Sequence, residues 1–76
     1  MRTEDEWAAH AKRLLKAEMT RRGVTYDQLT EKLAELGVRD TSVNIRNKVA
    51  RGKFTAVFLL QCLVAIGVTV IRLELD

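Results

Sequence analysis

Apolar residues recur at helical spacing along most of the chain, and a glycine follows each stretch of them. Spacings of three and four residues gather side chains on one face of a helix. In the first stretch this face holds Trp7, Ala11, Leu14, Leu15 and Met19. In the next two stretches it holds Leu29, Leu33, Leu36, Ile45 and Val49. The pattern predicts helices over about 4–22, 26–36, 40–51 and 55–66, ended by Gly23, Gly37, Gly52 and Gly67.

Residues at the start of two predicted helices have the spacing of a capping box. Thr3 with Glu6 and Thr25 with Gln28 could each satisfy two backbone N–H groups reciprocally. For the third helix, three successive residues could serve as the cap: Asp40, Thr41 and Ser42.

The last two segments depart from this pattern. Between residues 56 and 66 only Gln61 is polar, which predicts a helix buried on all sides. Three short helices cannot cover it completely, so we expect a second subunit to cover the rest. After Gly67, Ile71, Leu73 and Leu75 alternate with polar residues, as in a half-buried β-strand.

A lone strand cannot satisfy its own backbone groups, so its expected partner is the same strand of another copy. The alternative is an apolar tail packed on the domain. The prediction is therefore a mainly α fold, with a four-helix domain over residues 1–67 and a C-terminal dimerisation strand over 68–76. The residues expected to pair the two copies of a homodimer are Val70, Ile71, Leu73 and Leu75.

Composition excludes several kinds of site. With one cysteine, Cys62, and one histidine, His10, the chain can form neither an internal disulfide nor a Cys/His metal cluster. It lacks a nucleophile–base–acid set and a glycine-rich phosphate loop, so we expect no enzyme and no cofactor. The uncharged run over 54–71 approaches membrane-spanning length, but polar residues dilute it. The acidic start has no apolar leader, and we expect a cytoplasmic protein with membrane contact unlikely.

The positive charge of the third predicted helix points to a polyanionic partner. The formal net charge is +3, and residues 39–53 hold five basic side chains against one acid, Asp40. On a helical wheel one stripe of this helix gathers Thr41, Asn44, Asn47, Lys48 and Arg51. Asparagine can pair with adenine, and lysine or arginine with guanine, in the DNA major groove. The alternative is an ordinary solvated helix surface.

A second set of residues is expected to contact phosphates. The N–H groups at the start of the second helix, with Thr25 and Gln28, could bind a phosphate oxygen. The basic side chains expected to neutralise phosphates are Arg39, Arg46 and Lys53. Plain helix capping is the alternative role for Thr25 and Gln28.

The runs "GVTYDQLTEKL", "RGK" and "AIGV" resemble the lambda-repressor-like (Cro/C1-type) helix-turn-helix domain over about residues 14–68. The chain also resembles a group of small, uncharacterised bacterial proteins with a K-x-x-R-G-K-F run, which implies a fold and no assigned function. Where the lambda-repressor-like family often has a paired arginine and glutamate, this chain has Met19 and Ala50. Apolar packing in place of a buried ion pair would be tolerated.

Two functional hypotheses follow. The first is a small homodimeric DNA-binding protein that regulates transcription and contacts the major groove of double-stranded DNA with its third helix. The second is a protein-interaction or assembly module, which keeps the same fold but uses its apolar surface for a protein partner.

Overall fold

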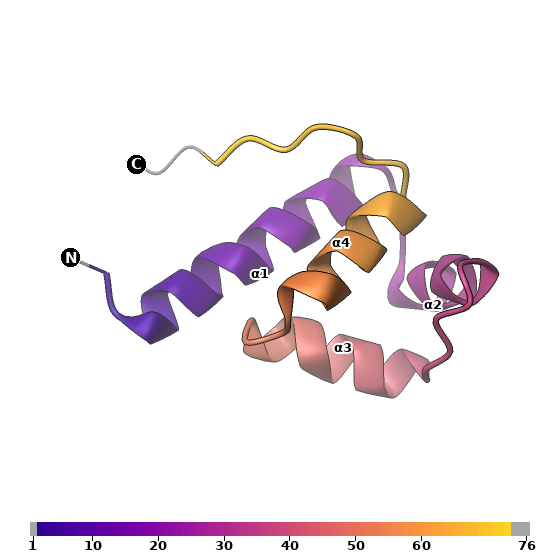
Figure 1. Cartoon of the computed structure of the whole chain (residues 1–76), viewed down its shortest axis with the longest axis horizontal. Coiled ribbons are helices and arrows are strands. Elements are labelled where there is room, and N and C mark those ends of the chain that lie inside the picture. The colour runs from indigo at the N-terminus through magenta and orange to yellow at the C-terminus, as the bar shows by residue number, and fades with distance from the viewer. Residues whose placement is uncertain (1, 74–76) are drawn as a thin grey trace.

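The computed structural model describes residues 2–73, and four helices make up the regular structure of this range (Figure 1). They are α1 (Glu4–Arg21), α2 (Tyr26–Glu35), α3 (Ser42–Arg51) and α4 (Ala56–Ala65). Each lies within about two residues of its predicted bounds, and the prediction of a mainly helical chain is confirmed.

All four helices begin after a threonine whose hydroxyl accepts a backbone N–H of the first turn. These caps are Thr3, Thr25, Thr41 and Thr55. Both predicted capping boxes are confirmed, because Glu6 accepts the Thr3 N–H at 3.0 Å and Gln28 accepts the Thr25 N–H at 2.9 Å. Of the three candidates at α3, Thr41 is the cap. Each such cap stabilises its helix by about 1 kcal/mol.

The helices enclose one core, in which α3 and α4 each pack against both α1 and α2. The side chains with no exposed surface are Leu15, Leu29, Leu33, Ile45, Val49 and Cys62. Leu36 was expected to face inward but is 50% exposed, because α2 has already ended and Leu36 is its C-cap residue. Met19 is buried and Ala50 is exposed, so Ala50 does not take the buried position that apolar packing in place of a buried ion pair would give it.

Gly52 holds the end of α3 against α1. Its φ is +69°, and a Cβ at this position would collide with the carbonyl group of Ala8. A larger residue would have to push the two helices apart, so a glycine is needed here for contact as well as for backbone conformation.

The predicted C-terminal strand is wrong for the described residues. Within 2–73 no residue is in a β-strand, and the chain after Gly67 runs back beside α1 and α4 (Figure 1). Val68 lies in the core and Ile71 packs against it, so this segment buries part of its apolar surface on its own domain. In the described part of the chain no strand lies beside it to complete a ladder, and the alternating residues lie in an irregular tail. Leu75 lies outside the described residues.

One side of α4 is exposed, although its composition predicted burial all round. Phe58, Cys62 and Leu63 face the core. The opposite side exposes about 60% of each of three side chains: Val57, Leu60 and Val64. We call these three residues the apolar face of α4. Between residues 2 and 73, no helix combines the length and apolar character that crossing a bilayer requires.

Candidate nucleic-acid interface

The outer side of α3 is polar and open to solvent. Ile45 and Val49 are fully buried and fix the helix to the core, so the opposite side must face outward. That side exposes all five residues predicted to contact bases: Thr41, Asn44, Asn47, Lys48 and Arg51. We call these five residues the polar face of α3.

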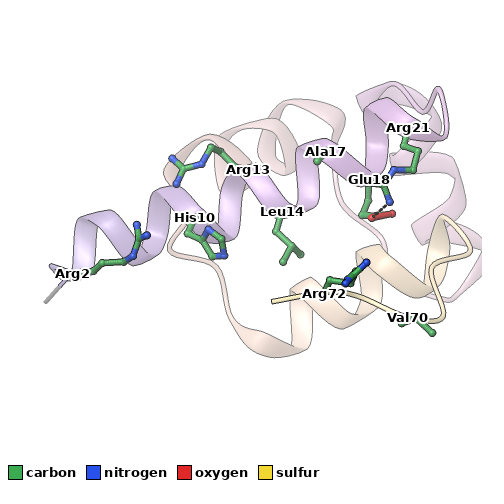
Figure 2. Close-up of a pocket in the computed structure, with 9 residues that line it drawn as sticks. All are labelled: Arg2, His10, Arg13, Leu14, Ala17, Glu18, Arg21, Val70 and Arg72. Atoms are coloured by element: carbon green, nitrogen blue, oxygen red, sulfur yellow. Dashed lines mark hydrogen bonds and ion pairs between the residues drawn. The ribbon is translucent and has the colours of Figure 1, made fainter. Parts of the chain in front are cut away.

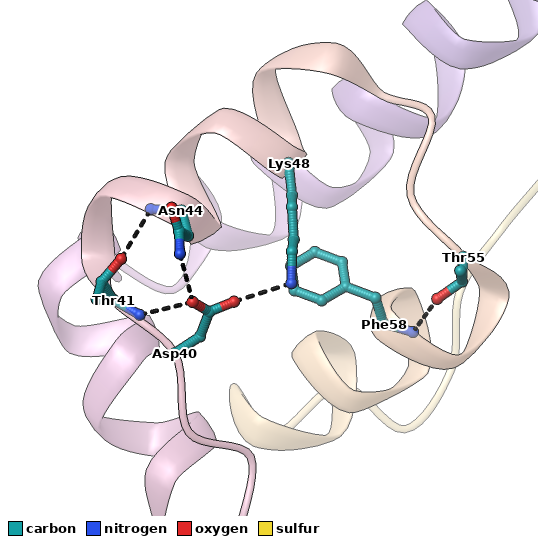
Figure 3. Close-up of polar contacts among 6 residues, drawn as sticks. All are labelled: Asp40, Thr41, Asn44, Lys48, Thr55 and Phe58. Carbon is teal, nitrogen blue, oxygen red and sulfur yellow. Dashed lines mark hydrogen bonds and ion pairs between the residues drawn. The ribbon is translucent and has the colours of Figure 1, made fainter.

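Asp40 binds three members of this face (Figure 3). Its Oδ1 accepts the Thr41 backbone N–H at 2.8 Å and the Asn44 Nδ2 at 3.0 Å. Its Oδ2 accepts the Lys48 Nζ at 2.8 Å. The Asp40 side chain is only 18% exposed, against 47% for Lys48. The Lys48 ammonium also lies 5.2 Å from the ring centroid of Phe58. Together these contacts fix the end of a long, flexible side chain.

These donors keep the Asp40 carboxylate ionised. The hydrogen bond from Lys48, followed by those from Asn44 and the Thr41 N–H, lowers the pKa of Asp40 to about 2. The carboxylate of Asp40, which borders the polar face, therefore stays ionised even in moderately acidic solution. Asn47 and Arg51, by contrast, form no side-chain hydrogen bond or ion pair with any residue in the described range.

The residues predicted to contact phosphates lie at separate places. Thr25 and Gln28 bind each other at the start of α2. The Arg46 guanidinium lies 5.4 Å from the ring centroid of Tyr26, at cation–π distance. Lys53 Nζ lies 2.8 Å from Asp5 Oδ1, which raises the pKa of Lys53 and lowers that of Asp5. Arg39 is exposed in the turn before α3.

Two small basic clefts border α3. One, of about 240 Å³, lies at the start of α4 and is lined by Lys48, Arg51, Lys53, Phe54, Thr55 and Phe58. The other, of about 290 Å³, lies at the start of α2 and includes Lys16, Thr25, Tyr26 and Arg46. Arg46 and Lys48 are about 200° apart on the helix, so the clefts lie on opposite sides of α3. A helix N-terminus beside basic side chains favours an anion in either cleft.

The family of the chain emerges from comparison of its sequence with family models. A model described as a domain of unknown function (DUF6471) matches residues 7–71. The chain belongs to this family. The matched range takes in α2, α3 and α4 completely and most of α1, so the whole polar face of α3 lies inside the family domain. Comparisons with curated proteins and with solved structures give no match.

The sequence interpretation missed three residues of this surface. Asp40 was considered as a cap and as the one acid of the basic segment, but not as a partner of the polar face. It lies four residues before Asn44 and eight before Lys48, at helical spacing. Lys16 was missed because the local charge count covered only residues 39–53. Residues 7–22 also hold five basic side chains against one acid. Val43 is 63% exposed on α3, where it could contact a thymine methyl group.

A third pocket, of about 440 Å³, lies between α1 and the tail and has a different character (Figure 2). It is lined by Arg2, His10, Arg13, Leu14, Ala17, Glu18, Arg21, Val70 and Arg72. Glu18 is buried there and binds Arg21 Nη1 at 2.9 Å, with Arg22 Nη2 at 3.7 Å. Arg21, three residues after Glu18, therefore makes the shorter of the two contacts.

Reactive groups do not gather elsewhere in the described range. Cys62 is in the core as expected, and burial raises the pKa of its thiol to about 12, which makes it a poor nucleophile. Across residues 2–73 no three His, Cys, Asp or Glu side chains come together as a group that could hold a metal ion.

Proposed function

We propose that the protein is a small DNA-binding protein of the cytoplasm that inserts α3 into the major groove and regulates transcription as a homodimer. The observation that carries the proposal is the polar face of α3, exposed between two basic clefts. Such a surface offers groups that contact base edges along its centre and cations for phosphates at its borders.

The order of the elements supports the same proposal. The short helix α2, the turn after it and α3 follow one another as the two helices of a helix-turn-helix do. In that arrangement the first helix crosses the DNA backbone, which would bring the start of α2 and the Lys16–Arg46 cleft to a phosphate. The resemblance to the lambda-repressor-like domain points in this direction too.

The homodimer is proposed from the apolar surface that one copy leaves exposed. A chain of this length buries only about 60–65% of its unfolded surface, so covering more apolar area would stabilise it. The candidates are the apolar face of α4 and two tail residues, Val70 and Leu73, which are 76% and 69% exposed. Ile71 is half-buried against its own domain and contributes less.

Selection of bound sequences from a random duplex library tests this function. A two-fold protein should enrich a palindrome with half-site centres about 34 Å apart. Arg51→Ala should reduce the binding free energy for the selected sequence by about 1–3 kcal/mol and relax the base preference at one position of the site. Lys53→Ala should instead weaken binding to all sequences alike. It should also make the dependence of log affinity on log salt concentration shallower by about one unit. If the chain binds no duplex DNA at about 50 mM salt, the proposal fails.

A protein-interaction module is the second candidate, and the apolar face of α4 favours it. Exposed apolar side chains that are contiguous on one helix are typical of a partner site. This candidate predicts that Leu60→Glu abolishes assembly, while Arg51→Ala and Lys53→Ala have no effect on any activity. The mass of the variants in solution, measured by light scattering, distinguishes the two functions when combined with the DNA measurements.

A further inference from the structure

Asp40 places a carboxylate among the groups proposed to contact DNA, and it already binds the side chains of two of these residues. Lys48 Nζ lies 2.8 Å from Oδ2, and Asn44 Nδ2 lies 3.0 Å from Oδ1. The cap of α3 is Thr41, whose hydroxyl accepts the Asn44 backbone N–H at 3.1 Å. The contacts from Asp40 to the two side chains are therefore not needed to start the helix.

The contact with Asp40 determines how the Asn44 amide is oriented. An ionised carboxylate only accepts hydrogen bonds, so the Nδ2 end of the amide must face it. One hydrogen on Nδ2 is used in this way, and the second hydrogen and Oδ1 remain available. These are the two groups with which an asparagine pairs with adenine in the major groove.

Lys48 is held at two points, by Asp40 and above the ring of Phe58. A free lysine on a flexible stem would act as a mobile point charge for any nearby phosphate. With one of its three donors on Asp40, two donors remain for acceptors such as guanine O6 and N7. The negative charge of Asp40 meanwhile weakens the attraction between this face and the DNA backbone.

We infer that Asp40 is a positioning residue, which gives the polar face of α3 its sequence selectivity and lowers its non-specific affinity for DNA. The inference rests on the proposed function and adds a residue that determines specificity through Asn44 and Lys48. It requires two measurable quantities to move in opposite directions. Without the carboxylate, binding to arbitrary DNA becomes tighter and discrimination between sequences becomes weaker.

The test compares the full chain with Asp40→Asn, Glu31→Gln, Lys48→Met and the double variant of Asp40 and Lys48. Each is measured on the selected duplex and on a scrambled duplex of equal length, over a series of salt concentrations. Asp40→Asn keeps the size of the side chain and an acceptor for the Thr41 N–H, but removes the charge that holds Lys48. We expect affinity for the scrambled duplex to rise about three- to tenfold and the salt slope to increase by about one. The ratio of selected to scrambled affinity should fall at least about tenfold.

Glu31→Gln is the matched control, because it removes the same charge from an exposed position on α2. It should raise both affinities together and leave their ratio unchanged. The double variant Asp40→Asn/Lys48→Met tests the route of the effect. If Asp40 acts through Lys48, the two changes are non-additive in the affinity ratio, and additive effects contradict the inference.

The outcomes separate this inference from the proposed function. A ratio that Asp40→Asn leaves unchanged overturns the inference while DNA recognition stands. A proportional loss of both affinities with a lower melting temperature assigns Asp40 a purely structural role and also overturns it. Duplex binding without sequence preference in the wild-type chain overturns the inference and the proposed base contacts of α3, while duplex binding itself stands. A wild-type chain that binds no duplex removes the proposed function and the inference together.

Discussion

Helices α3 and α4 are alike in construction and opposite in surface. Each has ten residues and begins after a threonine cap, and each packs against α1 and α2. The outer side of α3 presents amides and cations, whereas that of α4 presents the aliphatic side chains Val57, Leu60 and Val64. On the α3 face, Asn44 and Lys48 each donate one hydrogen bond to Asp40, and the remaining polar groups can bind water. The α4 face can be satisfied only by contact with another apolar surface.

This difference indicates how the two helices contribute to the domain. Buried residues of both helices determine the fold, so the outer sides are free to differ. On α3 the exposed groups can exchange water for hydrogen bonds to a partner at little cost to folding. On α4 the exposed groups remain in unfavourable contact with water in the single chain.

The largest expected effect tests whether α4 has one buried side and one exposed side. Leu63 is 4% exposed and Leu60 is 60% exposed on the same helix. Leu63→Ala should therefore lower the free energy of unfolding by about 2–5 kcal/mol. Leu60→Ala should change it by less than about 0.5 kcal/mol in a monomer. Urea unfolding at two protein concentrations measures both, and a concentration-dependent cost for Leu60→Ala would indicate that a second copy covers this face.

A second test concerns Gly52, the glycine that ends α3 and lies against α1. Gly52→Ala should cost about 2–4 kcal/mol, because the new methyl group meets the Ala8 carbonyl and φ is positive. Gly23→Ala is the matched control, since its φ is +65° but nothing lies within 4 Å of the added Cβ. It should cost only about 1–2 kcal/mol. Equal losses for the two variants in urea unfolding would contradict the close contact between α1 and the end of α3.

The threonine caps of α3 and α4 allow a test with a smaller expected effect. Thr41→Ala and Thr55→Ala should each cost about 1 kcal/mol, because each removes one acceptor from the first turn. In a domain of this size this corresponds to a fall in melting temperature of about 4–8 °C. Thr→Ser at either position keeps the hydroxyl and should restore most of the loss. Markedly unequal costs would indicate that one helix depends more on local structure than the other.

The smallest expected effect concerns the charge on the α3 side. The pKa of Asp40 is about 2 in the folded chain, against an ordinary value of 3.8. Since ionisation is favoured in the folded state, this group stabilises the fold above about pH 4 and loses that contribution as pH falls towards 2. Asp40→Asn and Lys48→Met should both flatten the stability profile in this window, as followed by thermal melting. A profile that neither variant alters would contradict the network around Asp40.

The sequence predicted the helices well because their signals are local. Threonine caps, apolar spacing and terminal glycines act within a few residues, and the bounds were correct to about two residues. Which side of α4 is buried could not be predicted. A helix with almost no polar residue has no periodic pattern of polar positions that would distinguish its buried face from its exposed face. The prediction of a C-terminal β-strand was wrong for a related reason. Alternation of apolar and polar residues is a property of one segment, whereas a β-strand also needs a second strand beside it.

The candidate site was predicted in part. Helical spacing correctly grouped the five residues of the polar face of α3 on one exposed side. What the spacing could not give is that Asp40 folds back onto this face, since that depends on the path of the turn before α3. The Lys16–Arg46 cleft joins residues thirty positions apart along the chain, and only the packing of α1 on α3 brings them together.

The position of Lys48 over Phe58 connects the two faces that have been contrasted. Phe58 is buried in α4, packs against Phe54, and supports a side chain that is proposed to meet DNA. A partner that shifts α4 by a fraction of an ångström would therefore shift Lys48 as well. Binding at the two faces would then be thermodynamically coupled, and the coupling must be reciprocal. DNA would strengthen or weaken assembly by the same factor by which assembly changes affinity for DNA.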